Sequence, residues 1–574
     1  MTSLAAAEPD TAPELDLTPS IAVIGAGFGG LCAALKLKQA GFNKLTIYEK
    51  GERVGGTWNY NTYPGCACDV RVQLYSYSFE QNANWSYVYA HNDEIQAYTE
   101  MIADKYQLRD HLKLNSEVKS AVWDSSKAKW KLSFASGAPA EVDILVGSLG
   151  QLNVPWFPDI PGRESFKGES FHSARWRHDV DLKTKKVGVI GNAASAVQFI
   201  PEIAKQAGKL TIFQRSANWL LPRNDKPFTD TDKNLFKYAP WLMSIGRNQI
   251  YWWAEWMFWG AFDPNDWRSR FFTQVSLQFL EKSVSDPHLR EKLTPKYPIG
   301  CKRIIFSDDY YPTLNEPHVS LITDAIEAIV PEGVKTKDGK VHELDVLIYG
   351  TGFETSNFNW SMDIVGKAGV RLKEAWKDGP EAYLGLTVAG FPNFFMTYGP
   401  NTNLGHNSII YMIERQVDYI VQCVEKMNEE NVGIFEVQRT VQDAFNRELQ
   451  EALNKTSWAG DCGSWYKNKS GKITNNWMGT TQDYKRRTRR PVFDDYEMRP
   501  RVDYSLNALP ARPAEQAAPP PVAAARPAAQ PQPAAAAPPP PPVAVAPPPP
   551  QAEPPAPAPV AVAPPAPPSE PEAS

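Results

Sequence analysis

The strongest constraint on the fold of this 574-residue chain is a short apolar strand that leads into a small-residue turn and a helix, a pattern that occurs twice. In the first copy, apolar residues 21–24 precede the turn Gly25-Ala-Gly27-Phe-Gly29-Gly30, and a helical segment follows from 31 to about 40. A second apolar strand ends at Glu49, nineteen positions after Gly30. This order of elements is typical of a dinucleotide-binding βαβ unit.

Each position of this first turn has a physical task. Gly25 permits the tight turn, Gly27 lets the backbone approach a pyrophosphate, and Gly30 allows the helix to pack closely on the strand. The amino-terminal end of the helix then faces the phosphates, and Glu49 is placed to accept hydrogen bonds from ribose hydroxyls. A lone glycine loop indicates little, but the complete unit predicts a bound dinucleotide.

The second copy has a degraded turn. An apolar strand, 186–190, leads into Gly191-Asn-Ala-Ala-Ser-Ala196, a helix to about 204 and a further strand, 210–213. Ala193 places a methyl group where the backbone should approach a phosphate, which predicts weaker binding. No acid follows the second strand. Arg215 stands there instead, and a cation at this point suits a ribose 2′-phosphate and thus favours NADPH over NADH; the alternative is an ordinary surface arginine.

Composition excludes several other functions. With 43% hydrophobic residues the chain can bury a large core, although the Pro/Ala-rich segment 505–574 and the N-terminal residues 1–20 are predicted to be disordered tails. The C-terminal tail is a linker or a ligand for proline-recognising modules. The net charge of −5 gives no reason to expect nucleic-acid binding, and the basic run 485–490 is interpreted as a charged face.

The cysteines and the apolar segments bear on location. Six scattered cysteines form no disulfide framework, and Cys66 and Cys68 lack nearby metal partners, so we expect a reducing, cytoplasmic setting and no metal. The aromatic-rich segment 239–262 is interrupted by Arg247 and Glu255, which argues against a membrane span. It is interpreted as a packing helix or an apolar access wall, with peripheral membrane contact as the alternative.

Two further segments identify a family. The first is Phe166-x-Gly168-x-x-x-His172-x-x-x-Trp176, between the two turns, and the second runs from Gly56-Thr-Trp58 through Tyr63-Pro-Gly to Asp69. Together they resemble the signatures of type I Baeyer–Villiger monooxygenases. The resemblance extends from about 21 to 496, and segments 399–408 and 462–466 resemble the subgroup that includes aryl-ketone monooxygenases.

The resemblance implies a reaction. NADPH reduces FAD, dioxygen adds to give a flavin C4a-peroxide, and this attacks a ketone to yield an ester or lactone. In the family an arginine stabilises the negative charge, and Arg303 matches it. Asp69 would orient Arg303, and Lys302 would join Arg215 at the NADPH phosphate. The substrates would be a small-molecule ketone and dioxygen.

The resemblance also assigns the remaining site residues. His172 is interpreted as a hinge residue between domains, together with Phe166, Gly168 and Trp176. The FAD set comprises Gly25, Gly27, Gly30, Glu49, Gly56, Thr57, Trp58, Asp69, Tyr75 and Val118. The NADPH set comprises Gly191, Asn192, Ala193, Ala194, Ser195, Ala196, Arg215, Ser216 and Lys302.

The predicted fold class is α/β, with two Rossmann-like dinucleotide-binding domains and an inserted helical region. The FAD-binding domain takes 21–160 and, with the C-terminal segment, 346–504; the NADPH-binding domain takes 161–225 and 300–345; the helical insertion takes 226–299.

Two other functions stay open. Arg177, where the family usually has Pro or Asp, and Ser173 are reminiscent of flavin monooxygenases that oxygenate nitrogen or sulfur with the protonated peroxide. The second alternative is a redox-impaired flavoprotein that acts through its Pro-rich tail. Arg303 separates the first two hypotheses, because oxygenation of nitrogen or sulfur needs no such arginine.

Overall fold

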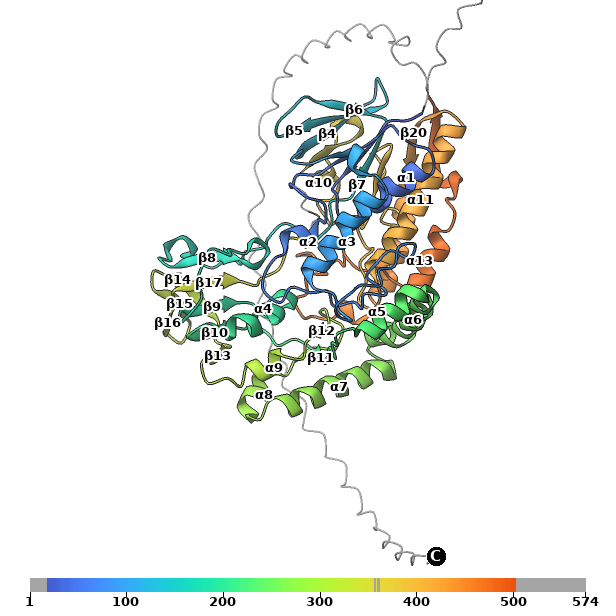
Figure 1. Cartoon of the computed structure of the whole chain (residues 1–574). Coiled ribbons are helices and arrows are strands. Elements are labelled where there is room, and N and C mark those ends of the chain that lie inside the picture. Colours follow the sequence, from blue (N-terminus) through green and yellow to red (C-terminus); the bar gives the residue numbers. More distant parts are fainter. Residues whose placement is uncertain (1–17, 356–357, 359–361, 502–574) are drawn as a thin grey trace, which may run out of the picture. The chain divides into compact units, whose positions relative to one another are not determined.

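The computed structural model describes residues 18–355, 358 and 362–501 (Figure 1). The predicted tails therefore lie outside the described residues, apart from 18–20. The described part of the chain contains two parallel five-stranded sheets, and each is built around one of the two predicted turns.

The first sheet has the strand order β19-β7-β1-β2-β3, and all of its pairs are parallel. Every residue of β1 (Ile21–Ile24) is buried, as expected for a central strand covered on both faces. The helix α1 (Phe28–Gln39) follows β1 and packs against α11 (Ile409–Glu429). The other strands are β2 (Leu45–Tyr48), β3 (Leu112–Lys113), β7 (Ile144–Gly147) and β19 (Phe394–Met396).

The second sheet has the order β13-β10-β9-β17-β8, again with parallel pairs. Its strands are β8 (Glu169–His172), β9 (Lys186–Ile190), β10 (Lys209–Phe213), β13 (Val319–Ile322) and β17 (Val346–Tyr349), and α4 (Ala194–Ala204) follows β9. The predicted boundary at 345/346 is wrong in one respect. β17 pairs with β9 and β8, so the chain leaves this sheet only after Tyr349. Its apolar sequence gives no sign of which sheet it joins.

Four smaller sheets surround these two. One consists of β4 (Val118–Asp124), β5 (Lys129–Phe134), β6 (Ala140–Val142) and β18 (Asp363–Val365). The next consists of β14 (Ile326–Val330), β15 (Gly333–Thr336) and β16 (Val341–Glu343). The two others are pairs, β11 (Leu220–Leu221) with β12 (Ile305–Phe306) and β20 (Val432–Val437) with β21 (Tyr496–Pro500). The remaining helices outside the inserted region are α2 (Thr57–Tyr60), α3 (Asn92–Lys105), α9 (Tyr310–Thr313), α10 (Leu372–Ala375), α12 (Arg439–Leu453) and α13 (Thr481–Thr488).

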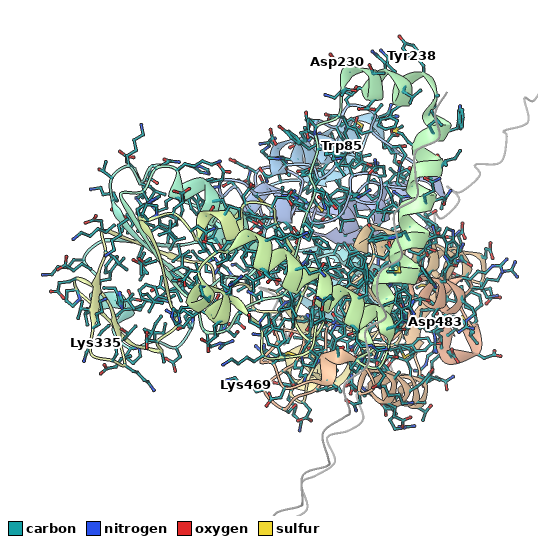
Figure 2. All side chains as sticks on the ribbon, turned by 90° about the horizontal axis from the view of Figure 1, so that it is seen from below. Trp85, Asp230, Tyr238, Lys335, Lys469 and Asp483 are labelled. Atoms are coloured by element: carbon teal, nitrogen blue, oxygen red, sulfur yellow. A yellow bond between two sulfur atoms is a disulfide. The ribbon has the colours of Figure 1, made fainter. Side chains whose placement is uncertain are left out.

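Four helices occupy the region predicted as a helical insertion, and Figure 2 shows the first of them between the labelled Asp230 and Tyr238. They are α5 (Asp230–Tyr238), α6 (Pro240–Trp253), α7 (Trp267–Ser283) and α8 (Pro287–Leu293), with a π-helical turn, Ala254–Phe258, after α6. Within the described part of the chain, every helix is too short or too polar to traverse a bilayer.

Candidate active site

The first turn has a geometry that only glycine accommodates. Gly25 has a φ of +100°, and a Cβ there would lie 2.5 Å from the Ser148 carbonyl oxygen. A Cβ on Gly30 would lie 1.8 Å from the Gly25 carbonyl oxygen, so the helix packs directly on the turn. α1 begins after Gly27 without a capping side chain, which leaves its first amide groups open to an anion.

Glu49 is held beside this turn at the end of β2. Its Oε2 atom accepts a hydrogen bond from the Ala26 amide at 2.8 Å, and its Oε1 atom accepts from the Gly51 amide at 2.8 Å and the Tyr60 hydroxyl at 3.3 Å. A carboxylate has about four acceptor positions. Glu49 therefore retains capacity for a ribose hydroxyl while its position is fixed by the protein.

The glycine pair Gly56 and Gly27 lies at the same place. Gly56 has a φ of +56°, and its Cβ would come within 2.9 Å of Gly27 Cα. Thr57 opens α2, and Trp58 in that helix donates from Nε1 to the Tyr75 hydroxyl at 3.0 Å. The structure thus brings the start of the second signature against the first turn.

Val118 is placed differently from the rest of the FAD set. It lies at the start of β4 and is buried in a hydrophobic cluster with Ala22, Ile24 and Tyr48. Its surroundings are apolar, and its assignment to FAD stays a prediction.

The second turn keeps the tight bend at its first glycine but has alanine at the other two key positions. Gly191 has a φ of +104°, and a Cβ there would lie 2.4 Å from the Gly350 carbonyl oxygen. Ala196 is buried and takes the helix-packing position, whereas Ala193 is exposed at the start of α4, which has no capping side chain. The residues between them are Ala194 and Ser195, both half-buried. The amide of Asn192 donates to Gln214 Oε1 at 2.7 Å and ties the turn to the end of β10.

Two cations lie close together beyond the end of β10, one from residue 215 and one from residue 302. Lys302 donates from Nζ to Ser216 Oγ at 2.7 Å. Burial lowers the pKa of Lys302 to about 8, and the positive charge of Arg215 contributes to this shift. Among the described residues, no carboxylate lies within ion-pair distance of either cation. A bound phosphate would offset both the burial and the repulsion, so the pair fits a ribose 2′-phosphate.

Arg303 and Asp69, 234 positions apart in sequence, form an ion pair with 3.1 Å between Nη2 and Oδ2. The Asp69 side chain is 7% exposed and the Arg303 side chain 38% exposed, so the acid is held inside while the cation reaches an opening. Burial opposes the charge of Arg303, but the Asp69 carboxylate outweighs it and raises the pKa of Arg303 above its usual value. The guanidinium therefore stays charged.

Residues that sequence reasoning missed complete this pair. Gln198 on α4 donates from Nε2 to Asp69 Oδ1 at 3.0 Å and accepts at Oε1 from the Tyr63 hydroxyl at 3.0 Å. Asp69 is thus fixed by a side chain of α4 as well as by Arg303. The signal for Gln198 in the sequence was weak: one polar residue two positions after Ala196 in an apolar helix.

Tyrosines also face Arg303. Burial raises the pKa of Tyr466 to about 12, although the charge of Arg303 lowers it. Burial likewise raises the pKa of Tyr398, which donates to Asn403 Oδ1 at 2.7 Å. Both hydroxyls remain protonated at neutral pH and supply neutral hydrogen-bonding groups beside the cation.

The first signature forms the edge of the second sheet. Phe166 packs into the hydrophobic cluster of this sheet, and a Cβ on Gly168 would lie 2.3 Å from the Asp345 carbonyl oxygen. Trp176 contacts Phe199 of α4, with ring centroids 5.4 Å apart. The spacing of the motif therefore reflects packing of β8 on the NADPH-side helix and strand.

His172 ends β8 as a buried, neutral residue. Its Nδ1 atom accepts a hydrogen bond from the Ala174 amide at 3.0 Å. Burial and the charge of Arg175 lower the pKa of His172 to about 4. Its ring packs edge-on against Phe157 and Phe353, which flank chain crossings between the two sheets. A hinge role for His172 stays a prediction.

The two residues that departed from the signature have ordinary surroundings. Arg177 is exposed and forms ion pairs with Glu169 and Asp179, each at 2.5 Å, and Ser173 is buried. Surface pairs of this kind contribute little to stability. Neither of these ion pairs of Arg177 involves Arg303 or Asp69.

The prediction that the cysteines form no disulfide is wrong for one pair. Cys301 and Cys462, 161 positions apart, are bonded to each other, with a Cα–Cα distance of 6.3 Å. The other four cysteines, Cys66 and Cys68 among them, are buried thiols. The bond fastens the residue next to Lys302 to the segment that carries Tyr466. A pair so far apart and without a repeated spacing gives no signal in a single sequence.

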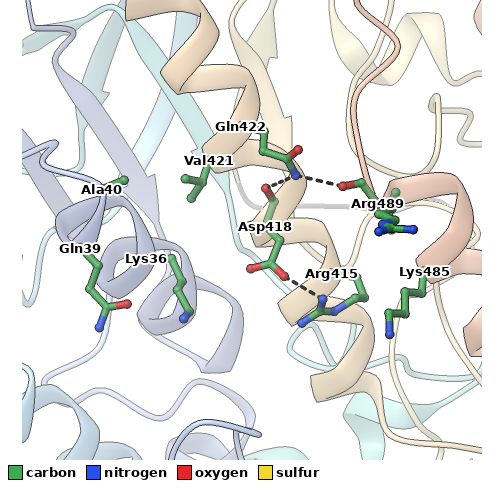
Figure 3. A pocket seen from close by; sticks show the side chains of 10 residues that line it. Lys36, Gln39, Ala40, Arg415, Asp418, Val421, Gln422, Lys485 and Arg489 are labelled. Carbon is green, nitrogen blue, oxygen red and sulfur yellow. Dashed lines mark hydrogen bonds and ion pairs between the residues drawn. The ribbon is translucent and has the colours of Figure 1, made fainter.

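A cavity of about 470 Å³ lies away from these residues, between α1, α11 and α13 (Figure 3). Asp418 within it is already paired with Arg415, at 2.9 Å. None of the predicted site residues lines this cavity, so we do not assign the active site to it.

Comparison with known proteins decides the family. The profile of the flavin-binding monooxygenase-like family matches residues 18–244. A Baeyer–Villiger monooxygenase from Pseudomonas aeruginosa is 40% identical over 472 residues, which cover 82% of this chain and 89% of that protein. A second, from Streptomyces coelicolor, is 38% identical over 506 residues, 87% of this chain and 95% of that protein.

The chain belongs to the Baeyer–Villiger monooxygenase family.

Solved structures of such monooxygenases share its fold. OTEMO in complex with FAD and NADP matches with a TM-score of 0.76 at 28% identity, over 84% of this chain and 99% of that one. A closed structure of cyclohexanone monooxygenase matches with a TM-score of 0.76 at 26% identity, over the same shares. The predicted α/β fold, the FAD and NADPH cofactors and the monooxygenase class are confirmed for this Baeyer–Villiger monooxygenase.

Proposed function

We propose that this chain inserts one oxygen atom from dioxygen beside the carbonyl of a small-molecule ketone and releases an ester or lactone. The observation that carries the proposal is the Asp69–Arg303 ion pair, in which a buried acid holds a permanently charged, partly exposed guanidinium. Negative charge develops on the oxygens that react with a ketone, and a preorganised cation stabilises that charge.

The chain's own residues fit both cofactors. FAD would be held at the first turn, where Gly25, Gly27 and Gly56 leave room for a pyrophosphate and Glu49 stands beside it. NADPH would be held at the second turn, with Arg215 and Lys302 at its 2′-phosphate. Bound FAD, once reduced by NADPH, activates dioxygen for transfer to the ketone.

Arg303, Asp69 and Gln198 then have distinct tasks. Arg303 is proposed as the catalytic residue that faces the substrate oxygen. Asp69 orients Arg303, and Gln198 orients Asp69 from α4, the helix that begins at the NADPH turn. The raised pKa of Arg303 keeps its guanidinium charged at neutral pH.

A screen of NADPH oxidation over linear, cyclic and aryl ketones and over thioethers tests this function, with product mass and fragmentation as the readout. A gain of one oxygen located in an ester supports the proposal. Sulfoxides in the absence of any ester would favour the N- or S-oxygenating alternative. The redox-impaired alternative predicts no bleaching of the flavin when the protein is mixed with NADPH without oxygen.

The state of the cysteines bears on a cytoplasmic location, which we propose from the sequence. A cytoplasmic setting agrees with four buried free thiols, whereas the Cys301–Cys462 bond requires protection from cellular reductants. Cys301 is fully buried, which limits access of a reducing thiol to its sulfur.

A further inference from the structure

The helical region exposes an unusual amount of apolar surface. Of the fifteen large apolar side chains that are exposed among the described residues, nine lie between 235 and 271. We call these nine the aromatic surface: Leu235, Tyr238, Trp241, Ile245, Trp252, Trp253, Trp256, Trp267 and Phe271. Scattered single residues of this kind need no explanation, but a concentrated patch marks an interaction site.

The aromatic surface follows consecutive elements of the chain. Trp241, Ile245 and Trp252 follow one another at spacings of four and seven, so they line one face of α6. Trp256, in the following turn, lies 6.2 Å from Trp267 between ring centroids. Trp267 in turn lies 6.5 Å from Phe271, which carries the surface onto α7. Figure 2 shows α5 and the two long helices of this region on the near face of the molecule.

The segment 241–256 itself contributes no charge to the outer side, although the guanidinium of Arg268 in α7 lies over the Trp256 ring, 5.8 Å from its centroid, and pairs with Asp266. The two charged residues of 241–256 both point inward: Arg247 donates to the carbonyl oxygens of Gln73 and Ser76, and Glu255 is 6% exposed. Glu255 accepts hydrogen bonds from Asn407 and Thr481, both at 2.9 Å. Because the side chains of Arg247 and Glu255 both point inward, no charged side chain of 241–256 lies on the outer face.

Charged side chains of both signs stand at the two ends of this face. Lys237 is exposed one residue before Tyr238 and packs over its ring at 5.7 Å, and Asp230 is exposed at the start of the same helix. Arg270 is exposed one residue before Phe271, and Asp263 is exposed shortly before Trp267. A neutral face rich in indole rings with charged side chains of both signs at its ends complements the zwitterionic headgroup level of a neutral lipid bilayer. Tryptophan and tyrosine favour that boundary, because their polar atoms meet the headgroups while their rings meet the acyl chains.

We propose that the aromatic surface docks on the interface of a phospholipid bilayer, with α6 lying along the membrane plane. Five of the nine residues are tryptophan, the residue type best suited to this boundary. A second protein copy would instead require hydrogen-bonding partners across the patch, roughly one per 100–200 Å². The exposed Asn248 and Gln249 lie on the same face of α6 and supply such groups, so the oligomeric state in solution decides between a bilayer and a second copy.

Vesicle flotation of the full, FAD-loaded chain tests this proposal. With neutral phosphatidylcholine vesicles at about 1 mM lipid, a large fraction of the protein should float. The variant Trp241→Ser/Trp252→Ser/Trp256→Ser should bind about tenfold more weakly, because it lacks three exposed indoles that the lipid would partly bury. Trp156→Ser/Val492→Ser removes exposed apolar side chains elsewhere and should bind as the wild type does. Flavin absorbance and circular dichroism confirm that each variant is folded.

Two further measurements do not depend on the variants. Phospholipids brominated near the top of the acyl chain should quench tryptophan emission of the wild type, and binding should persist in 1 M NaCl, because the contact is apolar. Absence of flotation and quenching would overturn the proposal, as would equal binding of the triple variant. A dimer that the triple variant dissociates, seen by light scattering without lipid binding, would assign the surface to a second copy instead.

Discussion

The two dinucleotide turns of this monooxygenase differ in the residues that form them and in the charges that lie beside them. In the first, Gly25 and Gly30 lie so close to backbone carbonyl groups that a Cβ would clash, and Glu49 beside the turn is held by three protein hydrogen-bond donors. The second has alanines at two of its three key positions, and its second strand leads to two cations that lack a carboxylate partner among the described residues. We propose that the first turn holds a resident cofactor tightly and that the second holds an exchangeable one by charge.

Gly30→Ala should give the largest effect. A Cβ 1.8 Å from the Gly25 carbonyl oxygen forces α1 away from the turn. We expect the free energy of unfolding to fall by about 3 kcal/mol and most of the FAD to be lost. The ratio of flavin to protein absorbance and calorimetry measure both. Gly246→Ala is the matched control, because nothing lies within 4 Å of its Cβ and alanine favours a helix. Full flavin content in Gly30→Ala would contradict the close packing.

Removal of either cation at the second turn comes next. Arg215→Ala and Lys302→Ala should each raise the KM for NADPH about thirtyfold, which corresponds to about 2 kcal/mol. The KM for NADH should change little, since NADH has no 2′-phosphate. Steady-state kinetics with both donors measure the difference. An equal rise for NADPH and NADH would show that these cations do not read the phosphate.

The pH dependence of NADPH binding should be smaller and has a definite sign. Burial and Arg215 lower the pKa of Lys302 to about 8, so its charge is present below that pH and is lost above it. The KM for NADPH should therefore rise about tenfold from pH 7 to pH 9. Lys302→Arg, which stays charged, should remove the rise. A flat profile in the wild type would mean that Lys302 does not contact the phosphate.

Ala193→Gly should have the smallest effect. Ala193 is exposed, so its methyl group has room on the outer side of the turn. Glycine is the better residue at the start of a helix, and we expect the KM for NADPH to fall no more than about threefold. A much larger fall would show that Ala193 crowds the phosphate after all.

Local features of both turns were predictable from sequence, because each depends on a few consecutive residues. Gly25, Gly30 and Glu49 needed only the strand, turn and helix pattern to be assigned. Lys302 and Arg303 could be placed only through the family resemblance, since a basic pair alone is usually a solvated one.

Contacts between distant segments were not predictable. Gln198 reaches Asp69 across 129 positions, and Cys301 reaches Cys462 across 161. Neither pair has a spacing that a physical rule would recognise. β17 was misplaced for the same reason, because an apolar strand does not reveal which of two sheets will accept it.

The most direct test of the account is the yield of ester per NADPH oxidised by Arg303→Ala beside the wild type, with the best ketone from the screen. The two turns are intact in this variant, so NADPH should still bleach its flavin in the absence of oxygen. In air it should consume NADPH and form no ester. Ester yield equal to that of the wild type would contradict the role of Arg303 as the cation that makes this a ketone-oxidising enzyme.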